Sequence, residues 1–160
     1  MIDRYARALC LVALATGLSG CGLTSSPADN LTFHAPAGWQ GSPGIMGFMQ
    51  FWKAPGNDAE VLMLFKSPKP MDQREVFNNA KLNETDVEQQ QAIKICGSQP
   101  AEYIKARGES NSGAKKTESE IEMVMTNAAG NTYFAMYVYP VGVRPNAEAS
   151  ASLRVLCPKT

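Results

Sequence analysis

The sequence ESEIEMVMTNAAGNTYFAMYVY, residues 118–139, decides the fold of this chain. Its first half places Ile121, Met123 and Met125 on one side of an extended backbone, because side chains alternate between the two faces of a strand. Three glutamates occupy the opposite side. In the second half tyrosines alternate with other apolar residues, and residues 127–131 supply a hairpin loop whose glycine tolerates positive φ. The stretch therefore predicts an antiparallel strand pair.

Further strands are predicted before this pair. Residues 31–35 alternate between apolar and polar side chains, as a half-buried strand does. The runs 45–52 and 61–65 are apolar on both faces, which is typical of a sheet covered on both sides. Residues 93–96 are predicted to form a short strand, and the polar residues 108–116 an exposed hairpin connection.

Two helices are predicted beside these strands. Asp72 is placed to cap the first, with Glu75 three residues later, and this helix is expected to end near residue 83. Asn146 is the predicted cap of the second, which Pro158 stops. Its apolar stripe comprises Ala149, Leu153, Leu156 and Cys157. The predicted fold class is α+β, a mostly antiparallel β-sheet flanked by helices.

The order of these elements resembles a known family. An opening strand ends in the turn Pro36, Gly38, Trp39 and is followed by a strand pair, a helix, more antiparallel strands, a tyrosine-rich strand and a final helix. This order is similar to that of the PsbP/Mog1-like α/β/α sandwiches and the DcrB-like bacterial lipoproteins, over residues 31–160. The resemblance implies a scaffold used for docking on larger assemblies, largely without catalytic residues.

The amino terminus resembles a bacterial lipoprotein signal. Arg4 and Arg7 precede the apolar run 8–18, and small residues stand before Cys21. The resemblance implies cleavage before Cys21 and a thioether-linked diacylglycerol on its sulfur, usually with a third acyl chain. Two or three chains make a stable membrane anchor. Ordinary secretion with a free Cys21 is the alternative.

This signal divides the chain into a signal peptide (1–20), a lipidated tether (21–30) and a single domain (31–160). The residue after the lipid cysteine is Gly22 and not the aspartate that often marks inner-membrane retention. We therefore expect the periplasmic face of the outer membrane if the cell has two membranes. Removing one aspartate and two arginines with the signal changes the formal charge from 0 to −1. Without a basic patch or stripe, no nucleic-acid partner is expected.

The cysteines predict one disulfide. Cys10 leaves with the signal and Cys21 carries lipid, so Cys96 and Cys157 can pair in an oxidising envelope compartment. Two separate buried thiols are the alternative. No metal or cofactor is expected, because these two cysteines and His34 fall short of the four ligands of structural zinc. The methionines are interpreted as core filler rather than Cu(I) ligands.

Catalytic motifs are absent from the sequence. His34 is the one histidine, and neither a Gly-x-Ser-x-Gly turn nor a Gly-rich phosphate loop occurs. We expect Glu118, Glu120 and Glu122 to keep their strand face in water, or to protect an edge strand from aggregation. The tyrosines of the following strand are expected to pack beneath a helix.

Two functional hypotheses follow. The favoured one is a lipid-anchored, non-catalytic envelope module that docks a protein partner or a small ligand, with Trp39, Met46 and Phe48 as candidate binding residues. Trp39 has a second interpretation as a side chain that fills the core. The alternative function is an envelope enzyme with a carboxylate-based site and no histidine triad.

Overall fold

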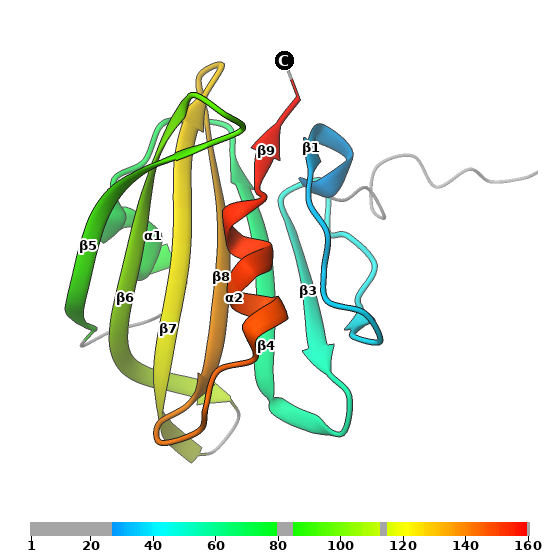
Figure 1. Ribbon diagram of the computed structural model, residues 1–160, viewed down its shortest axis with the longest axis vertical. Coiled ribbons are helices and arrows are strands. Elements are labelled where there is room, and N and C mark those ends of the chain that lie inside the picture. Colours follow the sequence, from blue (N-terminus) through cyan, green and yellow to red (C-terminus); the bar gives the residue numbers. More distant parts are fainter. Residues whose placement is uncertain (1–26, 80–84, 113–114, 160) are drawn as a thin grey trace, which may run out of the picture.

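One antiparallel sheet organises the molecule (Figure 1). The structure is a computed structural model that describes residues 27–79, 85–112 and 115–159. Within them the sheet has seven strands in the order β2-β3-β4-β8-β7-β6-β5. Their bounds are β2 Gln40–Gly41, β3 Met49–Ala54, β4 Asn57–Ser67, β5 Asp86–Ile95, β6 Gln99–Ser112, β7 Lys115–Ala128 and β8 Asn131–Pro140.

The other elements lie on both faces and at one end of this sheet. Helix α2 (Ala147–Arg154) lies in front of it in Figure 1, and α1 (Gln73–Asn79) lies behind. The turn η1 (Pro27–Asn30) leads into β1 (Leu31–Thr32), which pairs with β9 (Cys157–Pro158) in a separate two-stranded sheet. The α+β class, a mostly antiparallel sheet flanked by helices, is thus confirmed.

Two apolar layers hold the helices to the sheet. On the front, Ala149 and Leu153 of α2 pack on Leu62, Val124 and Tyr133. The layer behind the sheet joins α1 to the methionine-rich face, and its buried members include Val76, Phe77, Met123, Phe134 and Met136. Coverage on both faces explains why β8 is buried from Thr132 to Tyr139.

The predicted hairpin is present as β7 and β8. Met123 is opposite Met136, and Glu122 is opposite Tyr137, so the two faces separate as the alternation predicts. The connection is tighter than the sequence indicates, because Ala129 joins Gly130 in adopting positive φ, at 48° and 77°. Successive positive φ values give a turn whose twist matches that of the paired strands.

Three predicted strand boundaries are wrong, because polar stretches also pair. Strand β5 begins at Asp86 rather than at residue 93. The expected loop 108–116 belongs largely to the sheet, because β6 continues to Ser112 and β7 begins at Lys115. Backbone N–H and C=O groups form the ladder whatever the side chains are. Residues 86–92 of β5 are exposed on both faces of the sheet, so polar side chains are compatible with strand structure there.

Other predicted elements are shorter than expected. The strand expected at 31–35 keeps only Leu31–Thr32 in β1, although Leu31 is buried and His34 exposed. The strand expected at 45–52 begins at Met49, and residues 45–48 form a turn instead. The reason is a positive φ at Met46 and Gly47, which breaks the extended conformation.

The helix starts are confirmed. Asp72 accepts a hydrogen bond from the Glu75 amide (2.9 Å), and the Glu75 carboxylate accepts one from the Asp72 amide (3.3 Å), which is a capping box. Asn146 Oδ1 caps α2. The predicted end of the first helix near residue 83 falls outside the described residues. The second ends at Arg154, so Cys157 lies in β9 and not in the helix.

Candidate functional site

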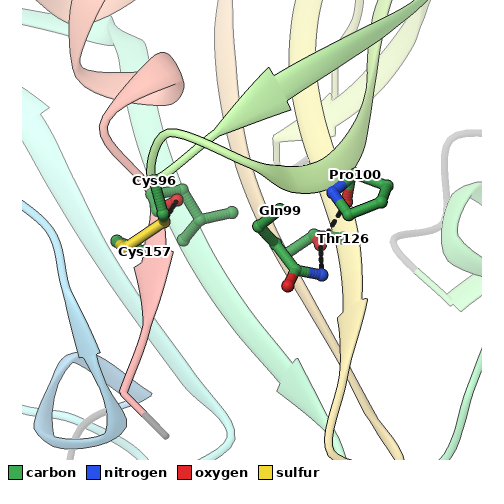
Figure 2. Close-up of a disulfide and its surroundings, with 6 residues drawn as sticks. Cys96, Gln99, Pro100, Thr126 and Cys157 are labelled. Atoms are coloured by element: carbon green, nitrogen blue, oxygen red, sulfur yellow. Dashed lines mark hydrogen bonds between the residues drawn. A yellow bond between two sulfur atoms is a disulfide. The ribbon is translucent and has the colours of Figure 1, made fainter.

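Cys96 and Cys157 form the predicted disulfide, with their Cα atoms 5.6 Å apart (Figure 2). Cys96 lies in the tight connection between β5 and β6, at φ 51°, and Cys157 begins β9. Beside it, Gln99 Nε2 donates to Thr126 Oγ1 (3.1 Å), which donates to the Pro100 carbonyl (2.7 Å). The disulfide therefore joins the hairpin at one margin of the large sheet to the small sheet. The lipidation residue Cys21 lies outside the described residues.

Met46 and Phe48 lie together in a turn that we call the apolar turn, residues 45–48. Its side chains are among the most exposed large apolar groups that the structure describes, at 45% for Ile45, 56% for Met46 and 41% for Phe48. The Phe48 amide donates to the Ile45 carbonyl (2.9 Å), and the Lys66 amide donates to the Phe48 carbonyl (2.7 Å). The turn is thus fixed to the end of β4 while its side chains face water.

Trp39 does not share this exposure. Its ring meets that of Tyr137 edge-on, with centroids 6.0 Å apart, and it packs against the front apolar layer. The Trp39 amide donates to the Pro36 carbonyl (3.3 Å), and Gly38 adopts a φ of 79°, so the predicted Pro-x-Gly-Trp turn is present. The packing favours the core interpretation of Trp39 and separates it from Met46 and Phe48.

A second cluster lies on the front of the sheet, beyond the start of α2, and we call it the carboxylate groove. Glu120 and Glu122 of β7 are 8% and 7% exposed, so they do not keep this face in water, and β7 is a central strand rather than an edge. An open hollow of about 370 Å³ runs above them. It is lined by Lys105, Glu120, Glu122, Tyr139 and the loop from Gly142 to Pro145.

Basic side chains of β6 balance one of these carboxylates. Glu120 Oε1 accepts a hydrogen bond from Arg107 Nη2 (2.8 Å), and Glu120 Oε2 lies 3.5 Å from Lys105 Nζ. Glu88 of β5 extends the network, 3.5 Å from Arg107 and 3.9 Å from Lys105. The hydrogen bond from Arg107 and the charge of Lys105 outweigh burial and lower the pKa of Glu120. Glu120 is therefore ionised at neutral pH.

Tyrosines surround the other carboxylate. Tyr139 Oη donates to Glu122 Oε1 (3.3 Å). Burial, followed by the charge of Glu122, raises the pKa of Tyr103 to about 12 and raises that of Tyr139 as well. The pKa of Tyr137 is also raised, mainly by burial and then by the hydrogen bond that its hydroxyl donates to Glu60 (2.7 Å). All three phenols therefore stay protonated and act as hydrogen-bond donors near neutrality.

This arrangement suits binding better than proton transfer. A general acid or base works best when its pKa lies near the operating pH. The pKa of Glu120 is lowered and those of the tyrosines are raised, so both kinds of group move away from neutrality. His34 is exposed and does not line the groove. The groove therefore presents fixed charges to a polar ligand, while the phenol of Tyr139 in its lining already donates to Glu122.

Metal clusters and membrane-spanning helices are both absent from the described ranges. Within residues 27–79, 85–112 and 115–159, no group of three or more His, Cys, Asp or Glu side chains could hold a metal ion. In those same residues, no helix is long and apolar enough to cross a membrane.

The sequence held a signal for the carboxylate groove that our interpretation missed. Lys105 and Arg107 share one face of β6 by their two-residue spacing, as Glu120 and Glu122 do on β7. In the observed register Lys105 is opposite Glu122, and Arg107 is opposite Glu120. With residues 108–116 predicted as a loop, the sequence leaves the register of these two strands undefined.

Comparisons with known proteins give weak likenesses. No protein-family model and no curated protein matches the sequence. Among solved structures, the chain is similar to cyanobacterial PsbP (CyanoP) from Synechocystis sp. PCC 6803, with 17% identity and a TM-score of 0.49 over 76% of this chain and 84% of that chain. It is also similar to PA94 of Pseudomonas aeruginosa, a protein of unknown function, with 12% identity and a TM-score of 0.45 over 70% and 84% of the two chains. Neither likeness carries an inference about function.

Proposed function

We propose that this protein is a lipid-anchored, non-catalytic module of the bacterial cell envelope that docks a partner through the apolar turn. The observation that carries the proposal is the exposure of Ile45, Met46 and Phe48 on one fixed turn. Scattered exposed apolar residues are ordinary, but a contiguous group is characteristic of an interaction site. The expected place of action is the periplasmic face of the outer membrane in a cell with two membranes, with Cys21 carrying the acyl chains.

The anchor is tested by replacing the lipid-bearing cysteine. With Cys21→Ser the thioether cannot form, so labelled fatty acid should enter the wild type and not the variant. The variant should also leave the membrane pellet at high salt while the domain stays folded. A variant that sediments as fully as wild type at high salt would show that something other than an acyl chain holds the protein there.

The carboxylate groove is the one observation that favours the enzymatic alternative, because two buried carboxylates converge in it. The groove favours a structural and binding role instead, because the ion pairs of Glu120 lower the pKa of this carboxyl rather than raise it. A purified protein that hydrolyses an envelope substrate, and loses that turnover in Glu122→Gln while remaining folded, would replace the docking proposal by the enzymatic one.

A further inference from the structure

We infer that the partner of the apolar turn is the bilayer itself, so that the protein contacts the membrane both through Cys21 and through residues 45–48. The inference rests on the lipid anchor of the proposed function and deepens it by naming what the turn binds. Three features carry it: the fixed shape of the turn, its place beside the start of the domain, and the charge of the surrounding sequence.

The turn holds its apolar side chains outward without any rearrangement. The Ile45 amide donates to the Met49 carbonyl (2.8 Å), and the Phe48 amide donates back to the Ile45 carbonyl (2.9 Å). At the tip, Met46 adopts a φ of 48°, a conformation that glycine or asparagine adopts more easily. A long apolar side chain at this exposed position costs stability and adds nothing to the core. Its exposed fraction of 56% makes it available to an apolar environment outside the protein.

The turn lies at the end of the sheet where the tether enters. The turn η1 packs against β3 and β4, and Figure 1 shows η1 and the segment that leads into β3 at the same end of the sheet. From Cys21 to Pro27 the chain has six residues, which span at most about 20 Å when fully extended. An acylated Cys21 therefore keeps this end of the domain close to the membrane surface.

The charge of this region fits an anionic lipid surface. Residues 30–57 contain no aspartate or glutamate, although the chain has 15 of them. Lys66 adjoins the turn, because its amide bonds the Phe48 carbonyl. Acidic side chains would be repelled by anionic headgroups, and basic ones are attracted. A cationic protein partner would be matched by carboxylates instead, so the composition favours lipid.

The test uses depth-dependent quenching on the acylated protein. A fluorophore is attached to Met46→Cys, with the Cys96–Cys157 disulfide left intact, and the protein is placed in phosphatidylethanolamine and phosphatidylglycerol vesicles that contain nitroxide-labelled lipid. The matched control is Val141→Cys, because Val141 is 37% exposed and lies in the loop between β8 and α2, at the other end of the sheet. We expect lipid quenching at position 46 and none at position 141.

The outcomes separate this inference from the anchor on which it rests. Acylated, vesicle-bound protein with equal quenching at the two positions, or with none, overturns the membrane contact and leaves the anchor standing. A probe at position 46 that native membranes shield from aqueous iodide, but that lipid vesicles do not quench, assigns the turn to a protein partner and overturns the inference. Protein that incorporates no labelled fatty acid defeats both proposals.

A retention measurement gives a second readout. Met46→Asp combined with Phe48→Asp should speed the transfer of acylated protein between vesicles by at least about tenfold, because two buried apolar side chains no longer hold it. Val141→Asp should leave that rate unchanged. Thermal melting shows that each variant is folded. An unchanged transfer rate in the folded double variant overturns the inference.

Discussion

Glu120 and Glu122 show how two buried carboxylates on one strand acquire polar partners in different ways. Glu120 accepts from Arg107 and lies near Lys105, so cations offset its burial. Glu122 accepts from the phenol of Tyr139. A buried charge without such partners costs several kcal/mol. Each carboxylate therefore depends on side chains of a neighbouring strand.

Replacing Glu120 by Gln should destabilise the protein in a pH-dependent way. The pKa of Glu120 is lower in the folded protein than the ordinary value of 4.5, so its ionised form stabilises the fold above that pH. We expect a loss of about 1.5–3 kcal/mol at pH 7, the range for a hydrogen bond to a charged group. As the pH falls below 4.5 the wild type loses this contribution, and the two proteins should converge in urea unfolding.

The matched control is Glu118→Gln, because Glu118 lies two residues earlier on the same strand and is exposed. It should change the free energy of unfolding by less than about 0.5 kcal/mol. Equal effects of the two variants would mean that the ion pairs of Glu120 do not contribute to stability.

Truncation to alanine should lower the free energy of unfolding much more at Trp39 than at Phe48. Trp39→Ala removes a ring that packs on Tyr137 and the front layer, so we expect a loss of about 2–4 kcal/mol in unfolding free energy. Phe48→Ala should cost less than about 0.5 kcal/mol, because its side chain is 41% exposed. Urea unfolding of both variants is the measurement. A small loss of stability in Trp39→Ala would contradict the core interpretation and favour Trp39 as a binding residue.

At the scale of elements, α2 is fixed by its first turn. Asn146 Oδ1 accepts from the amides of Glu148 and Ala149, both at 3.0 Å, and the Asn146 amide donates to Tyr137 Oη (3.0 Å). The cap thus joins a local helix signal to the sheet beneath.

Asn146→Ala should lower stability by about 1 kcal/mol, because the amides at the helix start lose their acceptor. Asn146→Asp keeps that acceptor and should stay within a few tenths of a kcal/mol of wild type. Thermal unfolding followed by circular dichroism compares the two. If the alanine and aspartate variants melt alike, the side-chain cap is not what stabilises this helix.

Helix starts were predictable and strand ends were not, for a physical reason. The capping of α1 and α2 depends on residues within three positions of one another, so Asp72 and Asn146 can be recognised as helix caps from the sequence. Strand length depends on which backbone lies alongside. The polar residues of β5 pair because β6 is available to them, and no side-chain pattern records that. The turn at Met46 shows the same limit, since a positive φ at methionine has no sequence signal.

For the molecule as a whole, the sequence predicted the disulfide and named Met46 and Phe48 as candidate binding residues, but it did not predict the carboxylate groove. The interpretation of the methionines as core filler is wrong for Met46, which is 56% exposed. The disulfide could be predicted from the number of cysteines left in the mature chain and from the oxidising compartment that the signal implies. The groove needed the register that brings Arg107 opposite Glu120 across β6 and β7, and register is a property of the assembled sheet. The exposure of Met46 could be inferred from its position among glycine and proline residues.

The disulfide joins two parts of the chain that are distant in sequence and belong to different sheets. Cys96 and Cys157 are 61 positions apart, and they join the β5–β6 hairpin to β9, which holds β1. Closing a loop of this length restricts the unfolded chain by about 4 kcal/mol in the chain-entropy account. Replacing both cysteines by Ala should therefore lower the free energy of unfolding by up to that amount.

The fold itself should survive this double replacement, because the ladders of the seven-stranded sheet do not include either cysteine. Urea unfolding of wild type and variant gives the stability difference, and the near-UV circular dichroism of the tyrosines and tryptophans reports the packing. Wild type under reducing conditions should match the variant, since both lack the covalent link. A variant as stable as oxidised wild type would show that the link is not a determinant of stability, and free thiols in protein taken from the envelope would show that the bond does not form there.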